Sequence, residues 1–219
     1  MTSNRARHAF GAFVIVIALF SATTAQGVGY GAYFEYARGI GQIDFFPVPV
    51  AVDRDSSVYG GGFALDTNVA GDKLFNYRLN IGYEYTSSEI FGGDFNTSNG
   101  LNLNNMFGFG VYRGQRARVW LGPSLRLSAD FWSDTLPGID IVDLGVGGGL
   151  ALGVNLHTGD VGSAALTFGY QYQYVATLVT QDLLLDHTHD GGRHLVSFNL
   201  TYFFRSDGDR YKANAGPPK

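Results

Sequence analysis

Apolar and polar residues alternate along most of this chain with a period of two. The clearest run covers residues 75–86 (FNYRLNIGYEYT), where aromatic and aliphatic residues occupy the odd positions and Asn, Arg, Gly, Glu and Thr the even ones. Successive side chains of a β-strand point to opposite faces. The run therefore predicts a strand with one apolar and one polar face.

Seven further segments show the same alternation, so the sequence predicts eight strands. They lie at about residues 28–37, 58–67, 101–112, 117–129, 144–157, 166–175 and 196–204. A strand of about ten residues is long enough to cross a bilayer when it is tilted. Pro123 lies within the fifth strand, where we expect a bulge or a lost hydrogen bond because proline has no N–H to donate.

The two faces of these strands differ in a way that indicates their surroundings. One face carries Gly, Asn, Gln, Ser, Arg and Glu, and the other carries mainly Tyr, Phe, Leu and Val. The first cannot form a dry core, and the second is too aromatic for a soluble surface. The pattern favours a barrel with lipid outside and a polar lumen over a soluble barrel or sandwich. The predicted fold class is all-β, a transmembrane eight-stranded antiparallel up-and-down β-barrel, because an open sheet edge would leave backbone groups unpaired in lipid.

The predicted connections alternate between short and long. Short ones lie at 70–73, 113–116 and 158–162, and long ones at 38–57, 87–100, 130–143 and 178–193. Short periplasmic turns and long extracellular loops are typical of bacterial barrels. An even number of strands places both termini on the periplasmic side.

The N-terminus has the pattern of a secretory signal peptide. Arg5 and Arg7 precede an apolar run from Ala9 to Phe20, and small residues continue to Ala25. The run is shorter than the roughly 20 residues of a spanning helix. We therefore expect a cleaved signal peptide at 1–25, the barrel at 26–204 and a disordered periplasmic tail at 205–219.

Composition narrows the class further. The 219 residues include 31 Gly, 13 Tyr and 17 Phe but only 16% charged residues, and a mean hydropathy of +0.01 is too low for a bundle of membrane helices. The absence of cysteine excludes disulfides and thiolate metal sites. A net charge of −4 argues against nucleic acid as a partner.

The last predicted strand resembles the terminal strand of small outer-membrane barrels. It reads VSFNLTYFF, with outward side chains expected at Val196, Phe198, Leu200, Tyr202 and Phe204. Strand count, loop lengths and this strand together resemble the eight-stranded barrels of the OmpA, OmpX and OmpW type over residues 28–204, without selecting one subfamily. The resemblance implies the cell outer membrane, a bilayer of outer-membrane lipid and lipopolysaccharide, and recognition of the last strand by the barrel assembly machinery. The chain departs from this type in continuing beyond Phe204.

Five charged side chains are expected to point into the lumen: Glu35, Asp66, Arg78, Glu84 and Arg126. The interior of an eight-stranded barrel is just wide enough for side chains to fill, and a buried charge is costly unless it is paired. Asp66 and Arg78 flank one short turn and are placed to pair across it, while Arg126 lies in the outer half with Glu84 and Glu35. Two interpretations stay open, a structural plug of salt bridges and a gated polar pore.

Glycines on the inward face bear on the same question. They leave one wall of the lumen bare at Gly145, Gly147, Gly149 and Gly153, and Gly108 and Gly110 add to it. The space either receives large side chains from other strands, namely Trp120, Tyr33, Tyr112 and the arginines, or leaves a narrow channel.

The first long loop is unusually apolar for a surface segment (IDFFPVPVAV, residues 43–52). Its candidate residues for an apolar mouth that admits solutes are Phe45, Phe46, Val48 and Val50. An exposed apolar patch marks a partner, a lipid contact or a ligand site, and the OmpW-type resemblance implies small hydrophobic molecules. The alternative is that the segment folds over the mouth or extends the first hairpin.

Other candidate chemistry is sparse. His187 and His189 lie between two aspartates and could bind zinc or copper, but no second ligand cluster is visible, so we expect no metal or other cofactor. Barrel enzymes of the lipid A deacylase type use a His and a Ser two residues apart on one strand face, whereas His194 and Ser197 are three apart and would face opposite sides. We find no nucleophile constellation of the kind that hydrolases need, and expect no enzyme.

The sequence thus favours a non-enzymatic barrel with one of two functions. The first is a narrow channel or port for small, hydrophobic solutes, as the OmpW-type resemblance implies. The alternative is a surface adhesin or antigen that binds host molecules through four long loops on a plugged barrel. A lipid-modifying barrel enzyme is a remote third.

Overall fold

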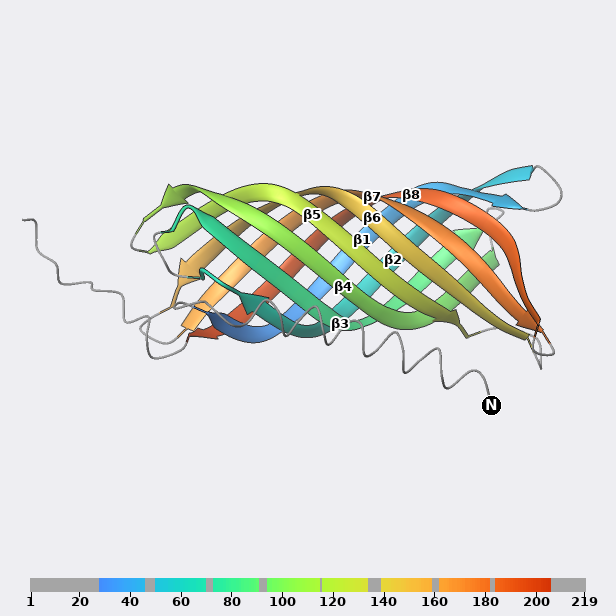
Figure 1. Cartoon of the computed structure of the whole chain (residues 1–219), viewed down its shortest axis with the longest axis horizontal. Helices are drawn as coiled ribbons and strands as arrows, with labels where there is room; N and C mark the ends of the chain where they lie inside the picture. Colours follow the sequence, from blue (N-terminus) through green and yellow to red (C-terminus); the bar gives the residue numbers. More distant parts are fainter. Residues whose placement is uncertain are drawn as a thin grey trace, which may run out of the picture.

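The structure, a computed structural model, describes residues 28–45, 50–69, 73–90, 94–114, 116–133, 139–158, 162–181 and 184–205. Eight antiparallel strands in chain order close into one barrel, which confirms the predicted fold (Figure 1). They are β1 (Gly29–Phe45), β2 (Val50–Asp66), β3 (Phe75–Ile90), β4 (Asp94–Arg113), β5 (Ala117–Trp132), β6 (Ile139–His157), β7 (Gly162–Gln181) and β8 (Leu184–Arg205). No helix among the described residues is long and apolar enough to span a membrane. The predicted signal peptide and almost all of the predicted tail lie outside the described residues.

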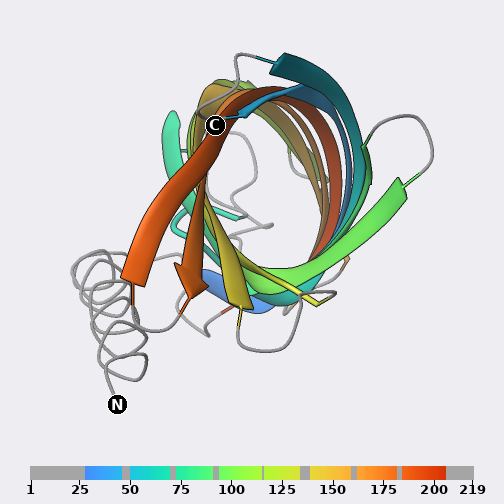
Figure 2. The same cartoon turned by 90° about the vertical axis from the view of Figure 1, so that its right-hand side faces the viewer.

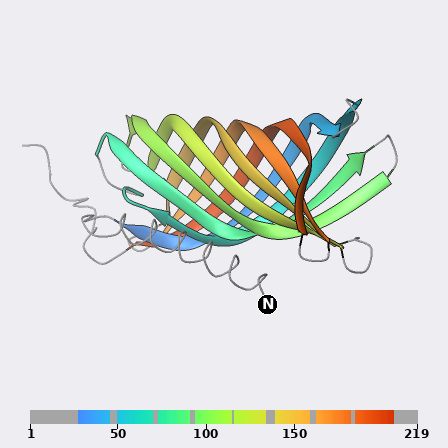
Figure 3. The same cartoon turned by 45° about the vertical axis from the view of Figure 1, so that its right-hand side comes forward.

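The strands are staggered around the barrel. Following paired residues from Gly29 through each neighbouring strand leads back to β1 at Gly39, ten residues further along. This stagger tilts every strand, as Figures 1 and 3 show, and the strands form a closed ring in Figure 2. A ring of eight strands encloses a lumen that side chains alone can fill.

The strands are longer than predicted. They have 16 to 22 residues, and most of the four segments expected to be long loops are strand. The β1–β2 ladder continues to the pair Phe45–Val50, and the β3–β4 ladder to Ile90–Asp94. The expectation of long loops was wrong because a strand that leaves the membrane keeps its pairing while its outward face turns polar. The described residues of the apolar segment 43–52, which are 43–45 and 50–52, extend the first hairpin, one of the alternatives left open.

An apolar band surrounds the barrel at the end where β1 begins and β8 ends, which we call the terminal end. Outward positions of all eight strands expose large apolar side chains. On β3 this band runs from Phe75 to Tyr85, a length that matches the roughly 9–11 residues of a tilted membrane strand. Aromatic pairs lie at both borders, with Phe75 against Phe109 near the termini and Tyr36 against Tyr59 at the other border. Such girdles are typical of outer-membrane barrels.

The barrel wall continues beyond this band at the end opposite Gly29 and Arg205, where β1 begins and β8 ends. Outward side chains there are largely polar: Arg38 contacts Asp55 at 2.9 Å, and Gln42 donates to Asp53 at 3.0 Å. We call this part the distal extension; it comprises the described residues within 38–57, 87–99, 131–143 and 176–192. Its β1–β2 hairpin, blue to cyan, lies at the upper right of Figure 1.

Two irregularities occur between β4 and β5. A register shift between Gly110 and Tyr112 turns Val111 and Tyr112 both outward. Tyr112, one of the side chains that the filled-lumen alternative placed inside, therefore lies outside the lumen, because the shift reverses its face. Pairing is also interrupted between Met106–Ser124 and Phe109–Leu121, opposite Pro123, in agreement with the lost hydrogen bond expected at this proline.

Candidate functional site in the lumen

The polar face of the strands forms a charged lumen. All five charged residues predicted to point inward do so, and each is 1% exposed or less: Glu35, Asp66, Arg78, Glu84 and Arg126. Their neighbours along each strand point outward, so the period-two alternation alone positions them.

Five more charged residues are buried inside and were missed: Arg54, Arg118, Asp130, Asp143 and Arg193. Four of them lie in segments interpreted as loops, and Arg118 precedes inward-facing Trp120 by two residues. Extending the period-two alternation into those predicted loops would have placed these four side chains on the inward face. The described lumen thus holds five acidic and five arginine side chains, which we group into three layers by their contacts.

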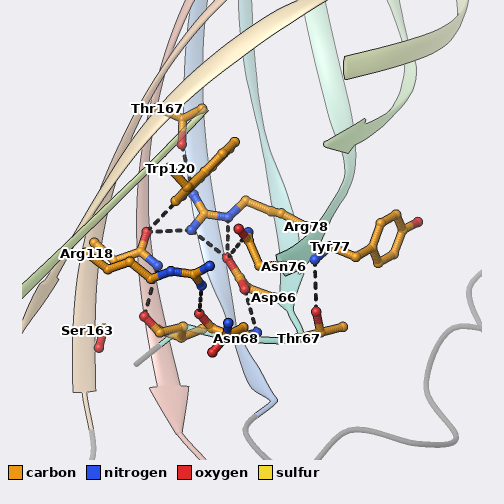
Figure 4. A network of polar contacts seen from close by, with 12 residues as sticks. Asp66, Thr67, Asn68, Asn76, Tyr77, Arg78, Arg118, Trp120, Ser163 and Thr167 are labelled. Atoms are coloured by element: carbon orange, nitrogen blue, oxygen red, sulfur yellow. Dashed lines mark hydrogen bonds and ion pairs between the residues drawn. The ribbon is translucent and has the colours of Figure 1, made fainter. Parts of the chain in front are cut away.

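The terminal layer lies next to the termini and centres on Arg78. Its Nε and Nη2 contact Asp66 Oδ2 at 2.9 and 2.7 Å, Nη1 donates to Thr167 Oγ1 at 2.8 Å, and Nη2 donates to Asn155 Oδ1 at 2.7 Å (Figure 4). Charge-assisted bonds of this number satisfy a buried guanidinium. The sequence-based pairing of Asp66 with Arg78 across their turn matches this geometry.

Aromatic rings complete the terminal layer. The Arg78 guanidinium lies 5.0 Å from the Trp120 ring centre and 4.8 Å from that of Phe203, a cation–π geometry. Trp120 lies over two glycines: a Cβ added to Gly108 would lie 2.6 Å from the Trp120 ring, and one added to Gly153 would lie closer still. At these positions the bare glycine wall is filled by Trp120, as the plug interpretation requires.

The β2–β3 turn folds into the same end of the lumen. Val69 is fully buried, and its carbonyl accepts a bond of 2.9 Å from Asn155 Nδ2. Arg118 reaches across the lumen and donates to the carbonyl of Asn68 (Figure 4). It also donates to the carbonyl of Lys73 at 3.1 Å. The described residues of the turn, 67–69 and 73–74, are therefore fastened to the lumen side chains at the terminal end.

The middle layer centres on Arg126. Its Nη1 contacts Glu35 Oε1 at 2.6 Å, and its Nη2 contacts Glu84 Oε2. Arg193 donates from Nε to Gln173 Oε1 at 2.8 Å, and Asp130 is within reach of Glu84. Glu35, Glu84 and Arg126, which come from three strands, are therefore brought together as the sequence pattern indicated.

The distal layer closes the lumen towards the distal extension. Arg54 Nη1 contacts Asp143 Oδ2 at 3.2 Å, and Arg54 Nε donates to Ser88 Oγ at 3.1 Å. Beyond it, Ile43 and Val52 form an apolar cluster with Trp132. A cavity of about 10 Å³, room for roughly one water molecule, is lined by Gly41, Gln42, Ile43, Arg54, Val175, Thr177, Gly191, Gly192 and Arg193.

Several sequence candidates are only partly described. Phe45 and Val50 end β1 and begin β2 as a backbone pair, but their side chains, and all of Phe46 and Val48, lie outside the described residues. His187 and His189 belong to β8, and their side chains are likewise not described. Among the described residues no group of three metal-ligating side chains occurs.

Two histidines bear on catalysis. His194 points outward with Nδ1 2.8 Å from the Tyr170 hydroxyl, and Ser197 is buried on the other face, as expected. His157 Nδ1 lies 3.2 Å from Ser163 Oγ across the β6–β7 ladder, a contact that sequence spacing did not reveal. Ser163 is fully buried, so its hydroxyl is not accessible to a substrate.

The outward residues of β8 lie on the lipid-facing surface. Val196, Leu200, Tyr202 and Phe204 are exposed. The Phe198 ring packs 5.2 Å from that of Phe168 on β7. The terminal strand thus presents the apolar stripe that its sequence predicts.

Comparison with known proteins shows which solved structures share this fold. No protein-family model and no curated protein matches this sequence. The outer membrane protein OprG from Pseudomonas aeruginosa has a similar structure, with a TM-score of 0.58 and 10% identity over 83% of this chain and 96% of OprG. The outer membrane protein AlkL is less similar, with a TM-score of 0.47 and 13% identity over 85% of this chain and 94% of AlkL. A major outer membrane protein from Thermus thermophilus has a TM-score of 0.41 and 13% identity over 80% of this chain and 99% of its own length. The chain has the fold of the small outer-membrane β-barrels.

Proposed function

We propose that this chain is a non-enzymatic outer-membrane protein that anchors a rigid extracellular binding surface, and that its lumen is not a path for solutes. The apolar band sits in the bilayer, the termini lie in the periplasm, and the distal extension projects outside the cell. A signal peptide at 1–25 exports the chain, and the barrel assembly machinery recognises β8.

The observation that carries this proposal is the closed lumen. Three charged layers and the folded β2–β3 turn occupy the described length of the barrel, and their side chains are almost completely buried. Adjacent strands are paired along the apolar band apart from the register shift beside Val111 and the interruption beside Pro123. A protein with a filled lumen and a wall longer than the bilayer acts through the part that extends into water.

The outward face of the distal extension is acidic, and this charge indicates the kind of partner that it would bind. Its outward acidic residues are Asp44, Asp53, Asp55, Glu89, Asp140 and Asp190, and its outward arginine, Arg38, is paired with Asp55. Acidic surfaces attract cationic molecules, and the attraction weakens as salt screens it. The partner we propose is therefore a basic segment of an extracellular protein.

Conductance of the chain refolded into planar bilayers tests the closed lumen. We expect no steady ion current at neutral pH from protein whose folding is verified by heat-modifiable migration. Frequent discrete openings of the unmodified barrel would show that the charged layers do not block the lumen, and the proposal would fail.

Binding to proteoliposomes tests the extracellular surface. An oligolysine peptide should bind at low salt, lose affinity as salt is raised, and bind more weakly when Asp44, Asp53 and Asp140 are changed to Asn. The matched control is Arg116→Gln, at the opposite end of the barrel, which should leave binding unchanged. Equal binding by all variants, or equal binding of oligoglutamate, would contradict the proposal.

A port for small hydrophobic solutes is the second candidate. Ile43, Val52, Val175 and the partly buried Trp132 supply apolar surface at the distal mouth, but the neighbouring cavity holds only about one water. A solute would have to displace Arg54 or Arg193. Quenching of a small aromatic fluorophore that is lost in Ile43→Asn and Val52→Asn would favour this function, whereas no quenching would favour the binding surface.

A further inference from the structure

The charges of the middle layer do not balance. It contains three carboxyl groups, on Glu35, Glu84 and Asp130, and two guanidinium groups, on Arg126 and Arg193, all buried. The distal layer is balanced by Arg54 and Asp143. The surplus arginine of the terminal layer, Arg118, is held by turn carbonyls at the other end. A buried layer with one uncompensated negative charge is strongly disfavoured.

The surplus carboxyl group is located by strand register. Glu84 on β3 is paired with Gly100 on β4, and Gly100 is paired with Asp130 on β5. A Cβ at Gly100 would lie 2.7 Å from the Asp130 Cα and closer still to its carboxyl group. The glycine leaves the space through which Asp130 reaches Glu84, and the two side chains are close enough to hydrogen-bond.

One oxygen of each carboxyl group makes no hydrogen bond, although the Asn102 amide is within reach of Glu84. Glu84 Oε1 and Asp130 Oδ1 are buried without a hydrogen-bond partner, whereas Glu84 Oε2 contacts Arg126. The titratable groups that face the pair are Tyr33 and Glu35 on β1, Arg126 on β5, Asp143 on β6 and Arg193 on β8. Arg126 already bonds Glu35 and Glu84, and Arg193 bonds Gln173.

We propose that Glu84 and Asp130 form a binding site for one positive charge, held between their carboxyl groups above Gly100. The ligand is a proton shared by the two oxygens or a small monovalent cation such as Na⁺. Two carboxylates in contact cannot both stay ionised in a buried site unless a positive charge joins them, as in paired carboxyl groups elsewhere. With that charge bound, the middle layer becomes neutral.

Infrared spectroscopy of the refolded chain tests the site. In a buffer whose only cation is N-methylglucamine, too large to enter, we expect the carbonyl stretch of a protonated, buried carboxyl group at neutral pH. The band should disappear in Asp130→Asn and, independently, in Glu84→Gln, because each leaves two carboxylates facing two arginines. Asp140→Asn, on the exposed face of β6, is the matched control and should keep the band.

Addition of Na⁺ distinguishes the two sources of charge. A band that persists in Na⁺ identifies a proton, and a band that decreases as Na⁺ replaces the proton identifies a cation site. A wild-type chain with no band in N-methylglucamine and no spectral response to Na⁺ would overturn the proposal. A band that remains in both variants would overturn it too, because the proton would then belong to another carboxyl group.

Discussion

Arg126 lies at the centre of the barrel with no contact to solvent. It bonds both Glu35 and Glu84, so three strands depend on one guanidinium for their charge balance. Because desolvation offsets much of the attraction between buried ions, such a pair adds little net stability, but removing one member leaves the others buried and unpaired.

Arg126→Met should therefore lower the free energy of unfolding by about 3–5 kcal/mol. Urea unfolding of the refolded chain, followed by tryptophan fluorescence, measures this. Arg38→Met, which breaks the half-exposed pair with Asp55, is the matched control and should cost less than about 1 kcal/mol. Equal losses in the two variants would mean that burial of the pair is unimportant.

The glycines of β6 differ in the space around them. A Cβ at Gly153 would overlap the Trp120 ring, whereas one at Gly148 would have its nearest neighbour 3.9 Å away. Overpacking a filled interior costs about 1–3 kcal/mol. Gly153→Ala should lower the urea midpoint, while Gly148→Ala on the outward face should leave it unchanged or raise it slightly; the reverse order would contradict the packing of Trp120.

At the scale of elements, the turn between β2 and β3 is held by a side chain from another strand. Arg118 on β5 donates to the carbonyls of Asn68, Lys73 and Leu74. The Lys73 carbonyl also accepts from Asn68 Nδ2, and the Leu74 carbonyl also accepts from the Gly110 N–H. Removing the guanidinium therefore takes one of two donors from these carbonyls and leaves the Asn68 carbonyl without the donor that Arg118 provides.

Arg118→Leu should loosen the turn without opening the barrel. We expect several-fold faster amide hydrogen exchange at residues 67–74, measured by mass spectrometry, with exchange in the strands unchanged. Arg116→Leu, an exposed position just before the start of β5, should have no effect. Protection of residues 67–74 that survives in Arg118→Leu would show that other contacts hold the turn.

At the scale of the whole molecule, the apolar band and the distal extension divide the outer surface into two zones. Leu152 lies within the band and Asp140 in the extension, both on the outward face of β6. The border between these two zones sets how deeply the barrel sits in the bilayer.

Leu152→Arg should destabilise the barrel in a bilayer by about 2–4 kcal/mol, because an arginine near the membrane centre must leave water. Asp140→Arg introduces the same side chain where the wall is in water and should change stability little. Equilibrium unfolding from lipid vesicles compares them. A larger loss of stability for Asp140→Arg than for Leu152→Arg would show that the distal extension, and not the apolar band, lies in the bilayer.

The sequence alone determined the strand count, the closure and the two faces of the wall. Each side chain of a membrane strand faces either lipid or the lumen, and this decides whether the residue is apolar or polar. The alternation at residues 75–86, and in the seven other strands, can therefore be read from each strand's own sequence. The same parity placed Glu35, Glu84 and Arg126 inside the barrel, and a shared turn brought Asp66 next to Arg78.

Only the tertiary structure decided how far the strands extend and which side chains meet. Pairing beyond the membrane is set by the neighbouring strand, so Arg54, Asp143 and Arg193 belong to the wall although their segments look like loops. The fit of Trp120 over Gly153, and of Asp130 across Gly100 to Glu84, depends on register and on the barrel's radius. The register and the radius are set when all eight strands close into one barrel with a common stagger, so they cannot be read from any single segment of the sequence.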